Sequence, residues 1–194
     1  QIQAVNEMLD ASMNNPSVII WAFYNEGPSN DKAAIPGYNA SANAIRARDT
    51  SRLVTWADNQ ETSSVTIGPI ADVASFNSYP AWYGGHGNTS VCYEHWNAMA
   101  DDVYQMWPGK PFLISETGAG GVYEYENATA CKWSQLYESE VVYADAFVAL
   151  NNSKISGITL WQFSDIKANE GDTEECGQCD YYPGETICAY INVS

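Results

Sequence analysis

Basic residues are scarce in this sequence of 194 residues, which has 8 lysines and arginines against 24 aspartates and glutamates. The resulting formal net charge of −16 repels phosphate backbones and anionic membrane surfaces, so we expect no nucleic-acid partner. The sequence also lacks an apolar run of about 18 residues, and it begins with Gln1-Ile-Gln-Ala-Val-Asn-Glu7 instead of a basic segment followed by an apolar one. Neither a membrane span nor a signal peptide is predicted.

Histidine is the next scarce residue, because His86 and His95 are the only two in the sequence. Cys176-Gly-Gln-Cys179 has the spacing of a zinc or redox site, but both histidines lie far upstream and no second pair of ligands accompanies it. We therefore predict no metal site and no other cofactor.

Cysteines and glycosylation sequons are present in numbers that indicate a compartment. Five Asn-X-Ser/Thr triplets accompany five cysteines, a combination that favours a secreted or lumenal protein with glycans and disulfides. The cysteines are Cys92, Cys131, Cys176, Cys179 and Cys188, and the sequons begin at Asn39, Asn88, Asn127, Asn151 and Asn192. We expect at least one disulfide among the last three cysteines, because that segment has few aliphatic residues to hold it in place. The odd count leaves a free thiol or a partner outside this chain.

The pattern of apolar residues predicts alternating strands and helices. The hydrophobic content of 45%, with 7 Trp and 13 Tyr, is sufficient for one domain with a sizeable core. Apolar runs predict strands over 17–23, 52–56, 72–76, 111–115 and 155–163. Helical spacing predicts helices over 1–14, 37–49, 94–107 and 134–151, which leaves one short connection between the second and third strands. Such alternation is typical of a parallel α/β fold. Three of these helices have an apolar stripe that we expect to face the core. The stripes are Ile2, Val5, Met8, Leu9 and Ser12 in the first, Trp96, Met99, Val103 and Met106 in the third, and Tyr137, Val141, Ala144 and Val148 in the fourth.

Two of the predicted strands stop at a glutamate. The first apolar run ends in Asn25-Glu26-Gly27-Pro28, and the run that begins at Pro111 ends in Glu116, followed by a glycine-rich segment. Because the carboxyl ends of parallel strands meet at one edge, we expect the two carboxylates to share a cleft. The first strand lacks the glycine motif of a dinucleotide-binding doubly wound sheet.

Five strands are too few to close an eight-stranded (β/α) barrel. We therefore predict an α/β fold in which residues 1–166 form the C-terminal five-eighths of a TIM barrel, strands four to eight with their helices. Residues 167–194 would form a cysteine-rich, irregular tail.

Four segments of the sequence resemble the barrel domain of glycoside hydrolase family 2, in particular its β-glucuronidase-like members. The segments are 15–27 with Asn25-Glu26, 77–83 with Asn-Ser-Tyr-Pro-Ala-Trp-Tyr, 110–119 with Glu116-Thr-Gly, and 157–165 with Trp161-Gln-Phe-Ser-Asp. The resemblance implies that barrel strands one to three, and the β-sandwich domains that usually precede the barrel, are missing from this sequence.

The resemblance also implies a retaining β-glycosidase that acts on a β-linked glycoside or oligosaccharide. Glu26 would be the acid/base and Glu116 the nucleophile, with carboxyl groups about 5 to 5.5 Å apart. Three further side chains would contact the sugar or the nucleophile, and Tyr83 is a weaker candidate for a sugar contact. Asn25 would bind the 2-hydroxyl of the sugar, Tyr79 would hold the nucleophile, and Trp161 would form the floor of the sugar subsite.

Several alternatives remain open at this point. The Asn-X-Lys pair that reads the carboxylate in β-glucuronidases is absent from 167–194, where Lys167-Ala-Asn169 has the reverse order. A β-galactosidase or a β-mannosidase is therefore an alternative to a β-glucuronidase. A catalytically inactive carbohydrate-binding or interaction protein is a second class of function, and a disulfide-held structural domain is a third. The intact glutamate pair favours the enzyme, although we expect little activity from these residues alone. The oligomeric state is left open.

Overall fold

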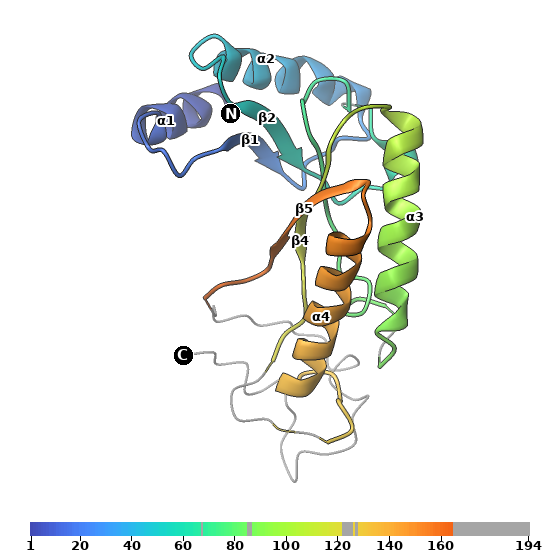
Figure 1. Ribbon diagram of the computed structural model, residues 1–194. Coiled ribbons are helices and arrows are strands. Elements are labelled where there is room, and N and C mark those ends of the chain that lie inside the picture. Colours follow the sequence, from blue (N-terminus) through green and yellow to red (C-terminus); the bar gives the residue numbers. More distant parts are fainter. Residues whose placement is uncertain (67, 85–86, 122–125, 127, 165–194) are drawn as a thin grey trace.

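The computed structural model describes residues 1–66, 68–84, 87–121, 126 and 128–164 (Figure 1). The helices are α1 (Ile2–Ser12), α2 (Ile35–Arg46), α3 (Ser90–Met106) and α4 (Gln135–Asn151), with short 3-10 turns at Lys32–Ala34 and Thr62–Ser64. The strands are β1 (Ile20–Asn25), β2 (Leu53–Ala57), β3 (Ala74–Asn77), β4 (Phe112–Thr117) and β5 (Ile155–Leu160). Each predicted strand and helix is present, with its bounds displaced by a few residues. The predicted tail, 167–194, lies outside the described residues.

All paired strands run parallel and follow one another in sequence order. β1 pairs with β2 in one sheet, and β3, β4 and β5 form a second sheet. Backbone hydrogen bonds of Asp58 join the two sheets, since its N–H donates to the carbonyl of Ser75 at 3.1 Å and its carbonyl accepts from Asn77 at 2.6 Å. The parallel α/β prediction is confirmed.

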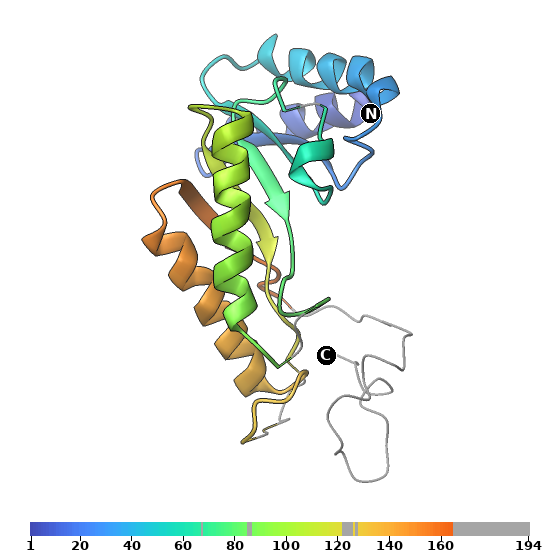
Figure 2. The same cartoon turned by 90° about the vertical axis from the view of Figure 1, so that its right-hand side faces the viewer.

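The helices cover the strands from outside. α3 and α4 pack against each other and lie along β4 and β5, while α1 and α2 lie beside β1 and β2 (Figures 1 and 2). The predicted apolar face of α4 is confirmed, and it consists of the buried residues Tyr137, Val141, Ala144 and Val148. Among the described helices, none combines the length and apolarity needed to cross a bilayer.

The predicted apolar stripes of α1 and α3 were partly wrong. In α3 the buried residues are Cys92, Trp96, Ala100 and Val103, whereas Met99 is only half-buried and Met106 is exposed. Trp107, just past the helix, fills the core in place of Met106 and stacks on Phe76 at 6.3 Å between ring centroids. In α1 only Val5 and Leu9 are buried.

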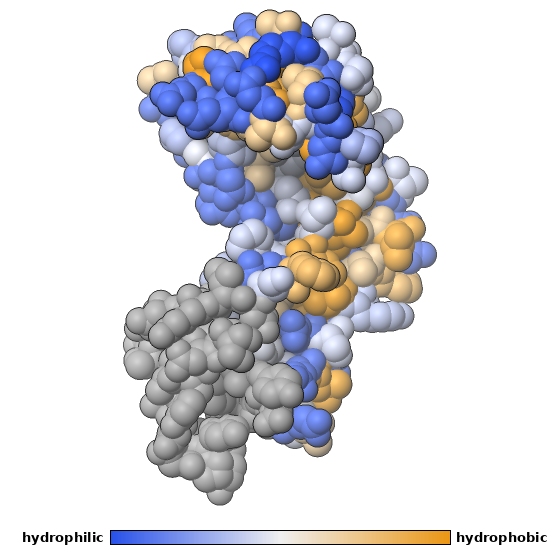
Figure 3. Space-filling view, turned by 90° about the vertical axis from the view of Figure 1, so that its left-hand side faces the viewer, coloured by the Kyte–Doolittle hydropathy of each residue, from blue (hydrophilic) through white to orange (hydrophobic). Residues whose placement is uncertain are grey.

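Several large apolar residues of the strands and their ends are exposed. Figure 3 shows apolar side chains gathered in the middle of one face of the molecule. The exposed residues at the strands are Ile19, Leu53, Leu160, Trp161 and Phe163. Five parallel strands cannot close a barrel, so a barrel built on these strands needs further strands at the open edges to cover such residues.

Candidate active site

Glu26 and Glu116 are carried at the carboxyl ends of their strands. Glu26 follows β1 directly, and its N–H donates to the carbonyl of Ala57 at 2.8 Å, which extends the contact between β1 and β2. Its φ of 50° lies in the left-handed region, where a residue with a side chain is strained by about 1 to 3 kcal/mol. Glu116 was expected just after its strand but lies within β4 and is half-buried. The turn at Glu26 therefore has to be held by its surroundings, whereas Glu116 is held by the sheet.

A buried carboxylate holds the turn that follows Glu26. Asp58 has an exposed fraction of 0%, and its side chain accepts hydrogen bonds from four groups. The donors are Trp56 Nε1 at 2.7 Å, Ser29 Oγ at 2.8 Å, the Gln60 N–H at 2.9 Å and the Tyr24 hydroxyl at 3.2 Å. These bonds fasten the segment after Glu26 to the end of β2. The sequence gave no indication of this role for Asp58.

Tyr79 contacts the carboxylate of Glu116. The Tyr79 hydroxyl donates to Glu116 Oε2 at 2.8 Å, and the Ser78 N–H donates to the Glu116 carbonyl at 3.0 Å. Burial raises the pKa of Tyr79, and the hydrogen bond and charge of Glu116 raise it further, with an additional contribution from the charge of Glu26. The hydroxyl therefore stays protonated and remains a donor at neutral pH. Both carboxylates act on this one hydroxyl, which agrees with a shared cleft.

An asparagine at the end of β3 connects the two glutamate-bearing strands. Asn77 Nδ2 donates to Asn25 Oδ1 and to Glu26 Oε1, both at 2.9 Å. Asn77 Oδ1 accepts from Ser115 Oγ at 2.7 Å, next to Glu116. The sequence places Asn77 directly after an apolar run, as it does Glu116, but it gave no indication that this side chain contacts Asn25 and Glu26.

Tyr83 and Trp161, the two aromatic candidates for a sugar contact, lie beside Tyr79 and beside the end of β4, respectively. Tyr83 is exposed and makes an edge contact with Tyr79 at 5.5 Å between ring centroids. Trp161 is 49% exposed, and its N–H donates to the carbonyl of Thr117 at 2.9 Å, which holds it beside the end of β4. The Trp161–Gln162 peptide bond is cis.

A second buried carboxylate lies behind β4. Asp145 of α4 accepts hydrogen bonds from Thr117 Oγ1 and from Trp96 Nε1, both at 2.8 Å. Burial raises the pKa of Asp145, while the hydrogen bonds from Thr117, Trp96 and the Cys92 thiol oppose the rise. Because Thr117 follows Glu116, Asp145 ties α3 and α4 to the end of the strand that carries the candidate nucleophile.

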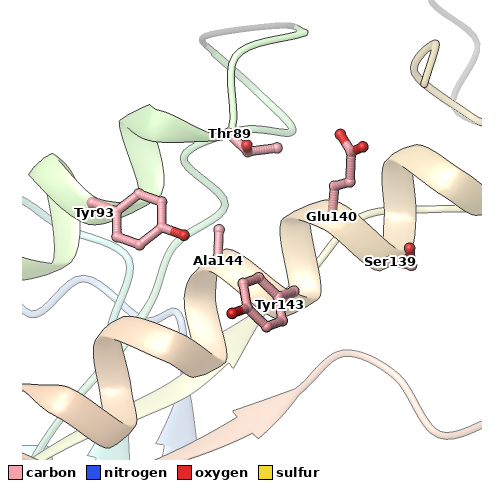
Figure 4. A pocket seen from close by; sticks show the side chains of 6 residues that line it. All are labelled: Thr89, Tyr93, Ser139, Glu140, Tyr143 and Ala144. Atoms are coloured by element: carbon pink, nitrogen blue, oxygen red, sulfur yellow. The ribbon is translucent and has the colours of Figure 1, made fainter. Parts of the chain in front are cut away.

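The rest of the described chain contains weaker candidates for a functional site than the strand ends, among them a hollow and a buried thiol. A shallow hollow of about 470 Å³ lies between α3 and α4, and neither Glu26 nor Glu116 lines it (Figure 4). Its lining consists of Thr89, Tyr93, Ser139, Glu140, Tyr143 and Ala144. Within the described residues, no group of three or more His, Cys, Asp or Glu side chains could hold a metal ion. Cys92 is a buried free thiol, whereas the disulfide predicted among Cys176, Cys179 and Cys188 falls outside the described residues.

Comparison with known proteins identifies related sequences and folds. The family "Glycosyl hydrolases family 2, TIM barrel domain" matches residues 1–183. The β-glucuronidase of Mus musculus is 25% identical over 178 residues, which is 91% of this chain and 27% of that protein. A family 2 β-galacturonidase from Eisenbergiella tayi bound to galacturonate is 26% identical with a TM-score of 0.79, over 88% of this chain and 30% of its own. The fold is shared with a Ruminococcus gnavus β-glucuronidase in complex with D-glucuronic acid, at 24% identity and a TM-score of 0.79, over 88% of this chain and 30% of its own.

Replacement of Gly118 tests the join between β4 and Trp161. An added Cβ would lie 2.7 Å from the Trp161 carbonyl oxygen, and the φ of +149° is itself unfavourable for a side chain. We expect Gly118→Ala to lower the free energy of unfolding by about 1 to 3 kcal/mol, measured by urea unfolding. Gly37→Ala is the control, because Gly37 lies within α2, an added Cβ would meet only Gln1 Oε1 at an ordinary contact distance of 4.0 Å, and alanine favours a helix. Equal stability of the Gly118 variant and the wild type would contradict the packing described.

The buried Asp145 predicts a pH dependence of stability. Its pKa in the folded protein lies above the unfolded value of about 3.9, so its stabilising contribution is full below that value and is lost as the pH rises through the folded pKa. Asp145→Asn removes this titration. We expect the melting temperature of the wild type, relative to that of the variant, to fall as the pH is raised from about 4 to 7. A difference that does not change with pH would show that the carboxylate titrates normally.

Proposed function

The chain belongs to glycosyl hydrolases family 2, and from this we propose that it is part of the catalytic domain of a retaining β-glycosidase. Residues 1–166 would supply barrel strands four to eight. The observation that carries the proposal is the pair of glutamates at the carboxyl ends of β1 and β4, with one tyrosine hydroxyl bonded to Glu116 and influenced by the charge of Glu26. A binding module needs no such pair.

In the first step of the proposed reaction, a Glu116 oxygen forms a bond to the anomeric carbon while the glycosidic C–O bond breaks. Glu26 transfers its proton to the departing oxygen. In the second step Glu26 takes a proton from water, the water oxygen bonds to the anomeric carbon, and the bond to Glu116 breaks. Glu116 Oε2 is engaged by Tyr79, so Oε1 is the oxygen available for attack.

The surroundings of the two glutamates suit these different roles. Glu26 is exposed on a turn, where it can reach both a leaving group and water, whereas Glu116 is half-buried within a strand. Retention requires the carboxyl groups to lie about 5 to 5.5 Å apart. Asn25, Trp161 and Tyr83 are proposed to contact the sugar, with Asn25 at its 2-hydroxyl and Trp161 beneath the ring.

The sugar is proposed to be a β-linked uronide or a neutral β-glycoside. The names of the relatives, which include glucuronidases and a galacturonidase, favour a uronide. Residues 167–194 contain no Asn-X-Lys pair and therefore give no support of their own to a glucuronide, so a galactoside or a mannoside is kept as the alternative. Turnover of p-nitrophenyl β-glucuronide, β-galacturonide, β-galactoside or β-mannoside by the complete polypeptide would identify the sugar. Carbohydrate binding without turnover of any of the four would favour the inactive binding protein instead.

A secreted or lumenal location is also proposed. Of the sequons in the described chain, Asn88 is exposed just before α3, whereas the sequon at Asn39 lies inside α2 with its Ser41 buried. Glycosylation at Asn88 would support this location, and the disulfide among Cys176, Cys179 and Cys188 would support it further.

Substitution of the two glutamates tests the mechanism. We expect Glu26→Gln to lower turnover of glycosides with poor leaving groups by about 10²- to 10⁴-fold, because the proton donor is lost. Glu116→Gln should abolish turnover, because an amide cannot form the covalent intermediate. Glu140→Gln is the control, since Glu140 is an exposed residue on α4. Activity of the Glu116 variant equal to that of the control would refute the assignment.

The proposal of a partial barrel predicts a low activity for the 194 residues alone. Among the described strands, the outer edges of β1 and β5 are unpaired, which would leave one side of the proposed cleft open. We expect hydrolysis by this chain to be far slower than by the complete polypeptide at equal molar concentration. Comparable rates would mean that these strands suffice for the reaction.

A further inference from the structure

Asn77 is placed to act on the chemistry through other residues. Its side chain is 5% exposed, and all of its hydrogen-bonding groups are used. The two N–H groups donate to Asn25 and Glu26, and the carbonyl oxygen accepts from Ser115. One amide thus joins the ends of β1, β3 and β4.

The partners determine how the Asn77 amide is oriented. A carboxylate can only accept hydrogen bonds, so Nδ2 of Asn77 has to face Glu26 and its oxygen has to face the Ser115 hydroxyl. The same Nδ2 lies 2.9 Å from the Asn25 side chain, which must therefore present its oxygen to Asn77. The NH₂ group of Asn25 is left to donate elsewhere, as binding of a sugar hydroxyl requires.

The two oxygens of Glu26 are held unequally. Oε1 accepts from the buried Asn77 at 2.9 Å, whereas Oε2 is contacted by the exposed Asn59 at 3.2 Å. An exposed glutamate on a turn would otherwise sample several rotamers. The bond from Asn77 restricts Glu26 to one orientation, with Oε2 as the oxygen that is freer to carry a transferable proton.

We propose that Asn77 is a positioning residue that orients Glu26 as proton donor, through Oε2, and Asn25 as donor to the sugar. This inference rests on the proposed function. Ser115 in turn fixes Asn77, so the acid/base on β1 is aligned with the nucleophile strand β4. A displacement of a catalytic group by about 1 Å can cost about 10²-fold in rate, which is the scale of effect expected when Asn77 is removed.

The test compares aryl β-glycosides with good and poor leaving groups, using the complete polypeptide. Asn77→Ala should lower kcat/KM by about 10²-fold for poor leaving groups, which need the proton from Glu26. It should lower kcat/KM less for a dinitrophenyl leaving group, which departs without a proton, and the loss that remains is the share due to Asn25. Ser115→Ala keeps Asn77 but removes the hydrogen bond that Ser115 donates to it. This variant should show the same dependence on the leaving group with a smaller loss of kcat/KM. It tests the inference even if Asn77→Ala does not fold.

Asn97→Ala is the matched control. Asn97 lies on the exposed side of α3, and its amide also both donates, to Tyr93, and accepts, from Asn152. An equal loss for all leaving groups in the Asn77 and Ser115 variants would mean a purely structural role and would overturn the inference, as would unchanged kinetics. An unsubstituted polypeptide without turnover would overturn the proposed function itself, and the inference with it.

Discussion

The backbone hydrogen bonds of Asp58 are the constraint on which the rest of the site depends. They join the β1–β2 sheet to the β3–β4–β5 sheet, since Asp58 donates to Ser75 and accepts from Asn77. The carboxylate of the same residue fastens the turn after Glu26 through Ser29. One residue therefore contributes both to the join between the sheets and to the position of Glu26. The contacts of Val54 with Asp72 and of Thr55 with Ser75 hold the same two strands further from the site.

Two buried carboxylates support the site from opposite sides. Asp58 holds the end of β2 beside Glu26, and Asp145 holds the end of β4 behind Glu116. Their oxygens accept hydrogen bonds from hydroxyl, indole and backbone donors and not from lysine or arginine, which suits a chain with so few of these residues. Removal of either carboxylate would leave several buried donors unsatisfied. Rigid support of this kind is what a proton donor and a nucleophile need to act on one carbon atom.

The strand order and the two glutamates could be predicted because buried parallel strands leave a local signature, an apolar run followed by a polar residue. The apolar stripe of α3 could not, because Trp107, beyond the helix end, takes the core position expected for Met106. Asp58, Asn77 and Asp145 could not be assigned roles either. The contacts that give them these roles, with Ser29, Glu26 and Thr117 respectively, join residues 28 to 51 positions apart in the sequence, so only the folded arrangement reveals them.

The covalent intermediate offers the most direct test of the account. The complete polypeptide would be incubated with 2-deoxy-2-fluoro-β-glycosyl fluorides of the uronic acid and neutral sugar series, which form the glycosyl-enzyme but release it slowly. Peptide mapping by mass spectrometry would then locate the label. The account predicts one sugar per chain, attached to Glu116. A label on Glu26 or on any other residue, from a compound that inactivates the enzyme, would contradict it.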